Sequence, residues 1–152
     1  MKKLFLLTLF LTWSLLPAQE THTDLNWLTD FEQAKTIAQK EHKPIIMLFT
    51  GSDWCPPCKA MHRDLFHNEE FIDLAGKVVL VMVDFPRRKP MSKEQRAQNY
   101  KLAGLYHKGG VPTFVAVSPD GKKVLGKISG YRYGEPDRDI AFFKRMIGLV
   151  KK

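Results

Sequence analysis

The sequence contains little cysteine, since Cys55 and Cys58 are the only two among its 152 residues. No second cysteine pair exists, so a metal site made of four thiolates is excluded. If these cysteines have a partner, it is each other or a ligand. A bridge between them closes a loop of only four residues, which stabilises a fold far less than a long-range bridge does.

The sequence also lacks an apolar run long enough for an ordinary transmembrane span. The N-terminal run, residues 4–16, is broken only by Thr8, Thr12 and Ser14. Two lysines precede it and Pro17-Ala18 follows it, which predicts a secretory signal over residues 1–18 that is cut after Ala18. We therefore expect an exported protein, periplasmic or secreted; an uncleaved anchor is the alternative. No cysteine near the cut could carry a lipid.

Internal repeats and low-complexity tracts are absent, and 44% hydrophobic and 26% charged residues predict a single globular domain over residues 19–152. Removing residues 1–18 lowers the net charge from +8 to +6. The densest basic cluster, Arg87-Arg88-Lys89, lies between prolines without interleaved aromatics. That pattern predicts a solvated loop and no nucleic-acid partner.

The two cysteines lie where a predicted strand passes into a predicted helix. Residues 45–49 are a continuous apolar run after Pro44, which indicates a buried strand, and residues 59–66 have helical spacing without Gly or Pro. Cys55 would then be the helix N-cap. Unpaired N–H groups and the positive end of the helix dipole favour a thiolate there, so Cys55 is the predicted nucleophile.

Two prolines separate the cysteines. Pro56 and Pro57 would occupy the first two helical positions, where a missing N–H costs little, and they leave Cys55 mainly with the N–H of Cys58 as a donor. The loop should be stiff. Cys58, one turn into the helix, is expected to be the more shielded sulfur and to resolve a mixed disulfide.

The rest of the chain predicts alternating helices and strands. Before the motif, Thr29 and Glu32 form a capping box for a helix that ends near Glu41. After the motif we expect a short helix capped by Asn68 up to Ala75, a buried strand over 78–83 followed by Asp84, and a helix from Ser92 to Tyr106 with Ala97, Leu102, Leu105 and Tyr106 facing inward.

The C-terminal third predicts an antiparallel pair and a closing helix. Residues 111–117 form a strand with Pro112 near its start, and Ser118-Pro119-Asp120-Gly121 is a turn into a strand over 123–129. Pro136 then opens a helix with apolar residues at three- and four-residue spacing.

Three features together resemble the thioredoxin superfamily over residues 26–150: the motif Trp54-Cys55-Pro56-Pro57-Cys58-Lys59 after a strand, Val111-Pro112-Thr113 before a hairpin, and the closing helix. The chain is most similar to exported bacterial thioredoxin-like proteins. The resemblance implies an α/β thioredoxin fold, a central mixed β-sheet flanked by α-helices. It also implies thiol-disulfide exchange through the cysteines, a cis bond before Pro112 facing them, and Trp54 as a lip for substrate.

The sequence departs from thioredoxins at one position. Their strand before the motif carries a buried acid that helps proton transfer to the second cysteine, whereas Leu48 or Phe49 stands there in this chain. Asp53 and Asp84 are the nearest acids, and we expect both to cap or flank their elements. Proton transfer from Cys58 would then need water or another group.

A metal site is an alternative interpretation, because His62 is four residues after Cys58 and could join both cysteines around zinc or copper. A lone Cys-x-x-Cys between strand and helix nevertheless indicates redox chemistry before metal binding. We predict a solvated His62 and no metal, and we expect His22, His42, His67 and His107 to be solvated as well. Tyr131 and Tyr133 are interpreted as hairpin packing, and a purely structural disulfide is the weakest alternative.

Together these patterns predict a monomeric thiol-disulfide oxidoreductase acting on protein disulfides. Cys55 would be the nucleophile and Cys58 the resolving thiol, with Trp54, Val111 and Pro112 contacting substrate and no cofactor beyond the redox-active disulfide. Its partners would be protein clients and a membrane electron donor or thiol reductant. A disulfide-forming oxidase is the alternative, but the similarity to thioredoxin and a length that leaves little room for a helical insertion favour a reductant.

Overall fold

The computed structural model describes residues 25–150, so the predicted signal segment and His22 lie outside the described residues. The strands are β1 (Trp27–Leu28), β2 (Ile45–Thr50), β3 (Val79–Asp84), β4 (Thr113–Val117) and β5 (Val124–Ser129). The helices are α1 (Phe31–Glu41), α2 (Pro56–Asp64), α3 (Glu69–Ala75), α4 (Lys93–Tyr106) and α5 (Asp137–Val150). Apart from β1, which is too short to leave a sequence pattern, these are the predicted elements.

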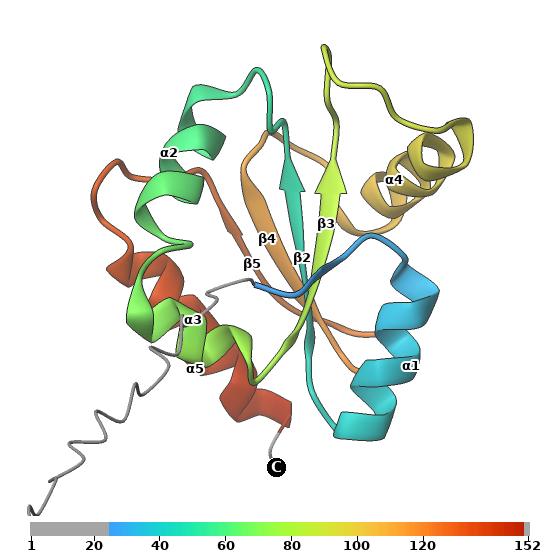
Figure 1. Cartoon of the computed structure of the whole chain (residues 1–152). Coiled ribbons are helices and arrows are strands. Elements are labelled where there is room, and N and C mark those ends of the chain that lie inside the picture. The colour runs from blue at the N-terminus through green and yellow to red at the C-terminus, as the bar shows by residue number, and fades with distance from the viewer. Residues whose placement is uncertain (1–24, 151–152) are drawn as a thin grey trace, which may run out of the picture.

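The five strands form one mixed sheet in the order β1-β3-β2-β4-β5. β3 is parallel to both β1 and β2, whereas β4 pairs antiparallel with β2 and with β5. Helices α1 and α4 lie on one face, and α2, α3 and α5 lie on the other (Figure 1). This arrangement confirms the predicted mixed sheet flanked by helices, and it places the C-terminal ends of β2 and β3 side by side at the motif.

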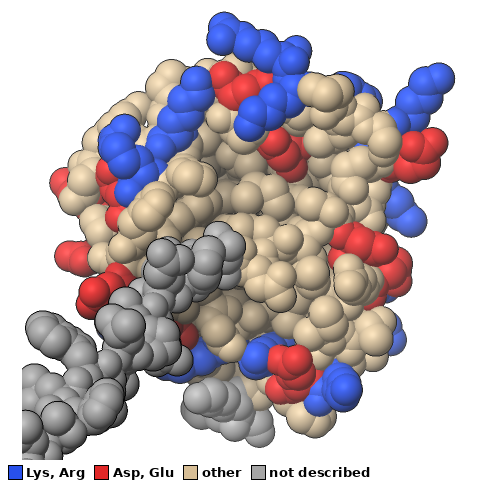
Figure 2. Space-filling view, in the orientation of Figure 1, with Lys and Arg blue, Asp and Glu red and all other residues tan. Residues whose placement is uncertain are grey.

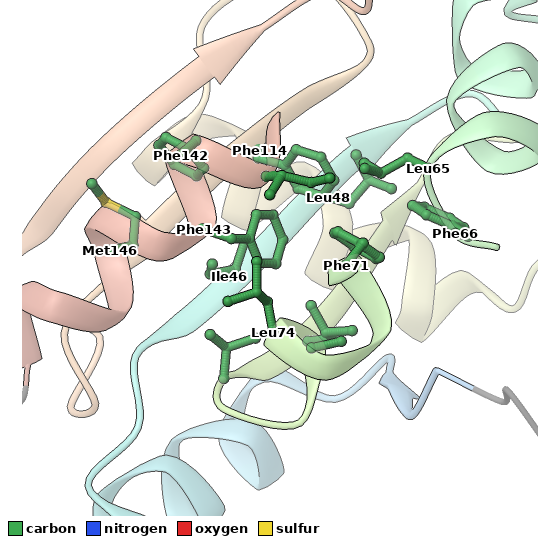
Figure 3. Close-up of a cluster of buried hydrophobic side chains, with 14 of the residues drawn as sticks. Ile46, Leu48, Leu65, Phe66, Phe71, Leu74, Phe114, Phe142, Phe143 and Met146 are labelled. Atoms are coloured by element: carbon green, nitrogen blue, oxygen red, sulfur yellow. The ribbon is translucent and has the colours of Figure 1, made fainter. Parts of the chain in front are cut away.

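The core has two layers because the central strands are buried on both faces. All six residues of β2 are buried. Its even-numbered side chains join α3 and α5 in a cluster where Phe71 and Phe114 both contact the ring of Phe143 edge-on, at centroid distances of 4.9 and 5.1 Å (Figure 3). Its odd-numbered side chains pack against α1 and α4. The sheet is therefore a rigid support for the loops at its edge.

The predicted N-cap of α1 is wrong, because Asp30 occupies that position instead of Thr29. The Asp30 carboxylate accepts hydrogen bonds from the N–H groups of Glu32 and Gln33, at 2.8 and 3.2 Å. The Thr29 carbonyl accepts from the side-chain amide of Gln98 on α4, at 2.7 Å. The local cap by Asp30 thus places Thr29 one residue before the N-cap, where its carbonyl binds α4.

The predicted inward face of α4 is also partly wrong. Leu102 is buried, but Ala97 is exposed and Leu105 is 64% exposed. Asn99 is buried instead, and its side-chain amide donates to the Asp84 carbonyl at 2.8 Å. The helix thus presents a polar donor to the last carbonyl of β3.

The hairpin and the final helix match the prediction. β4 and β5 pair across the turn at Ser118–Gly121, and Pro136 precedes α5. The two tyrosines after β5 differ from each other. Tyr131 is buried and its hydroxyl donates to the Asp64 carboxylate at 3.3 Å, whereas Tyr133 is 60% exposed. The packing interpretation therefore holds for Tyr131 and is wrong for Tyr133, which lies in the turn after the hairpin.

Candidate active site

Cys55 and Cys58 form a disulfide at the point where β2 passes into α2. Cys55 is the N-cap of α2, Pro56 and Pro57 are its first residues, and the Cys58 N–H donates to Cys55 Sγ at 3.3 Å. The predicted N-cap position and its donor are confirmed. A sulfur held there faces the positive end of the helix and one backbone donor, so its thiolate is favoured in the reduced protein.

Both cysteines are buried, at 3% exposure for Cys55 and 6% for Cys58, so the prediction that Cys58 is the more shielded is wrong. The covering element is the loop before β4, whose Val111 carbonyl oxygen lies 3.7 Å from Cys55 Sγ. The Val111–Pro112 bond is cis, as predicted. The fold thus brings Val111 and Pro112 to the disulfide across more than fifty residues of sequence.

The turn between β2 and Cys55 is fixed by the end of β3. Asp84 accepts hydrogen bonds from the Ser52 N–H at 2.9 Å and from the Ser52 hydroxyl at 2.5 Å. The indole of Trp54 covers Gly51 so closely that a Cβ there would overlap the ring. The indole N–H of Trp54 donates to the Phe85 carbonyl at 2.8 Å. The ring is partly exposed at the rim of the site.

Asp53 holds the basic loop between β3 and α4 against the motif. Its carboxylate accepts hydrogen bonds from the N–H groups of Arg87 at 3.0 Å, Arg88 at 2.6 Å and Lys89 at 3.0 Å. The hydrogen bond from Arg87, together with those from Arg88 and Lys89, lowers the pKa of Asp53 to about 2. The Arg87 guanidinium lies 3.9 Å from the ring centroid of Trp54. Residues 87–89 are exposed, as the sequence predicted for this loop. The hydrogen bonds to Asp53 nevertheless hold the loop beside the disulfide.

Asp53→Asn should release this loop. An amide oxygen is a weaker acceptor than a carboxylate and cannot keep three donors, so we expect the amide hydrogens of residues 87–89 to exchange with solvent about tenfold faster. Hydrogen exchange followed by NMR measures this at each amide. Asp73→Asn, an exposed change on α3, is the matched control, and unchanged exchange at 87–89 in Asp53→Asn would contradict the role of Asp53.

No acid lies at the end of β2, where thioredoxins carry one. Leu48 and Phe49 are 2% and 0% exposed. The carboxylates of Asp53 and Asp84 hold backbone and serine donors, which confirms that they flank their elements. Cys58 instead borders a hollow of about 280 Å³.

His107 is buried at 7% exposure, so its predicted solvation is wrong. Its ring lies 4.6 Å from that of Phe49, between centroids, and neither ring nitrogen has a hydrogen-bond partner among the described residues. Burial, with a further contribution from the charge of Lys127, lowers the pKa of His107. Its position at the end of α4 suggested exposure, but its ring packs against β2 and Gly109 lies beside it. His42 and His67 are exposed as predicted.

His62 is exposed and lines the hollow beside Cys58. Its ring contacts Phe66 and His67, at centroid distances of 5.2 and 5.9 Å. Burial, followed by the charges of His67 and Lys89, lowers the pKa of His62. Within residues 25–150 no three His, Cys, Asp or Glu side chains come together as a metal-binding group.

Comparison with known proteins agrees with this geometry. A family model described as thioredoxin-like domain matches residues 31–139. The disulfide bond reductase DsbH of Chlamydia pneumoniae is 35% identical over 130 residues, covering 84% of this chain and 74% of DsbH. The thiol:disulfide interchange protein DsbD of Campylobacter jejuni is 27% identical over 121 residues, 80% of this chain but 20% of DsbD.

Among solved structures, DsbH oxidoreductase superimposes with a TM-score of 0.74 and 31% identity, covering 83% of this chain and 86% of DsbH. The superposition agrees with the sheet order and helix placement described above.

Proposed function

The chain belongs to the thioredoxin-like domain family and is a thiol-disulfide oxidoreductase, and from this premise we propose that it reduces protein disulfides outside the cytoplasm. The observation that carries the proposal is the Cys55–Cys58 disulfide at the N-terminus of α2, with Cys55 as the capping residue. The similarity to a protein named as a disulfide bond reductase supports the direction of transfer.

Two electrons pass from the protein to the client in two exchanges. The Cys55 thiolate attacks one sulfur of a client disulfide, the client S–S bond breaks, and one client sulfur leaves as a thiolate that takes up a proton. Cys58 then loses its proton to water in the adjoining hollow and attacks Cys55 Sγ. The second client sulfur leaves, and the protein ends with the Cys55–Cys58 bond that the structure shows.

The rim of the site supplies the substrate contacts in this proposal. Among the described residues no hydrogen bond engages the Val111 N–H, and the Val111 carbonyl faces Cys55. An extended client segment could therefore pair with this backbone, as strands do when they add to an edge. Pro112 fixes the direction of that backbone, and the partly exposed indole of Trp54 would pack against the client.

Export is part of the proposal, with residues 1–18 as the signal and 19–152 as the exported domain, acting as a monomer. None of the helices within residues 25–150 combines the length and the apolar character that crossing a membrane requires. A reductant in an oxidising compartment must be re-reduced, so we propose a membrane electron donor or a thiol reductant as the second partner besides the protein clients.

Equilibration with glutathione buffers tests whether the protein reduces or forms disulfides. We expect a reduction potential between about −270 and −180 mV, because two prolines at the start of α2 remove N–H donors that would otherwise stabilise the Cys55 thiolate. The fraction of oxidised protein is followed by thiol alkylation and mass shift. A potential near about −120 mV, where strong oxidants lie, would show that the protein makes disulfides instead.

A further inference from the structure

We propose that α2 and the loop between β3 and α4 form a basic subsite beside Cys58, which selects client disulfides that have an acidic side chain next to the attacked cysteine. This inference rests on the proposed function and adds the substrate class.

The subsite is the hollow of about 280 Å³ that is lined by Ser52, Cys58, Lys59, His62 and Lys89. Lys59 comes from α2, one residue after the sulfur, and Lys89 comes from the loop between the sheet and α4. Among the described residues neither lysine makes an ion pair, although seven other pairs are present there. Two lysines without an acidic partner among the described residues therefore line the same hollow as Cys58.

Positive charge continues across the loop to the opposite side. A second hollow, of about 470 Å³, is lined by Trp54, Arg87, Lys89 and Arg96 among others, so Lys89 borders both hollows. Figure 2 shows Lys and Arg side chains gathered along the upper edge of the molecule, over α2 and the end of β3, with Asp and Glu side chains among them. Through Lys89, which borders both hollows, the basic surface runs from Cys58 to the partly exposed indole of Trp54.

The nearby acids offset part of this positive charge, but among the described residues none of them forms an ion pair with Lys59 or Lys89. Asp53 lies among the basic residues, but its carboxylate is occupied by the backbone N–H groups of the loop, and Asp84 is occupied by Ser52. The Asp53 carboxylate binds the backbone N–H of Lys89 and so holds this residue at the hollow. It forms no ion pair with the Lys89 ammonium group. A carboxylate from outside the protein would be the free partner for Lys59 and Lys89.

The geometry suits an acidic side chain close to the client cysteine. An extended chain advances about 3.3 Å per residue, so a residue one or two positions from a cysteine bonded to Cys55 reaches the neighbouring hollow. Both lysines are exposed, so salt screens their attraction for a carboxylate and the effect is largest at low ionic strength. The lysines would then favour such clients in the encounter and in the mixed disulfide.

Two disulfide peptides that differ only by Glu or Gln beside the cysteine test the inference. Each is mixed with the pre-reduced full domain, and the second-order rate constant of thiol release is measured at low ionic strength. We expect the Glu peptide to react about fivefold to tenfold faster. In Lys89→Glu the ratio should fall to about one or below, whereas Lys77→Glu, the same charge change at the opposite end of β3, should keep it.

The ratio of the two peptide rates distinguishes the basic subsite from the proposed oxidoreductase function. Equal rates for the Glu and Gln peptides in the wild-type protein would overturn the subsite while leaving the oxidoreductase intact. Reaction of neither peptide would overturn the proposed function itself. An equal loss of the preference in Lys77→Glu and Lys89→Glu would also overturn the subsite, because it would show that net charge alone steers the peptides.

Discussion

Cys55→Ser should abolish catalysis of insulin reduction by dithiothreitol, leaving only the uncatalysed rate of the reductant. A serine hydroxyl cannot replace the thiolate that the α2 N-terminus favours, and no other cysteine in the chain can attack from this position. The precipitation of reduced insulin, followed by turbidity, measures the effect. Equal activity in the wild type and Cys55→Ser would remove the proposed enzymatic role of Cys55.

Cys58→Ser should behave differently, because it keeps the nucleophile and loses the resolving thiol. We expect it to accumulate mixed disulfides with clients, seen as additional bands on non-reducing gels that disappear on reduction. Accumulation in Cys55→Ser instead would reverse the two roles. Both variants should stay folded, since the bridge closes only a four-residue loop, and thermal unfolding followed by circular dichroism is the control.

Asp139→Asn should remove the loss of stability that this carboxyl group causes as the pH rises from 3.8 to about 6. The side chain of Asp139 is fully buried at the start of α5, and neither carboxylate oxygen has a hydrogen-bond partner among the described residues. The closest cation, Arg138 Nε, is 3.8 Å away. Burial raises the pKa of Asp139 from 3.8 to about 6, although Arg138 opposes the shift.

The direction in which Asp139 changes stability with pH follows from proton binding. Between pH 3.8 and about 6 the folded protein binds more protons at Asp139 than the unfolded chain does, so stability falls as the pH rises through this window. At pH values above about 6, the buried charge lowers the free energy of unfolding by about 2 to 3 kcal/mol. Asp139→Asn lacks a group to deprotonate, and we therefore expect it to be more stable than the wild type at pH 8 and to differ less at pH 5.

Urea unfolding of the oxidised protein at both pH values measures this. Asp137→Asn, in the same turn but exposed, changes the net charge equally and should keep the wild-type pH dependence. Parallel pH profiles for the wild type and Asp139→Asn would contradict the role of the buried carboxyl group.

The sequence by itself determined the chemistry at the helix start. Cys55 as N-cap, Pro56 and Pro57 as the first helical residues, and the apolar strand before them are local features, decided by backbone donors and side chains a few positions apart. The capping of α3 by Asn68 was predictable for the same reason. The pairing of Val111 and Pro112 with the cysteines depended on family resemblance, because no local pattern places a loop fifty residues away.

Only the tertiary structure decided what surrounds the disulfide. Asp53 bonds to a loop more than thirty residues away, the ring of His107 packs against Phe49 of β2, and the loop before β4 covers Cys55. Each result depends on which segments the sheet brings side by side, and free energy from distant contacts then overrides local preference. The basic residues after β3 are visible in the sequence, but their position beside Cys58 follows from β3 ending next to β2.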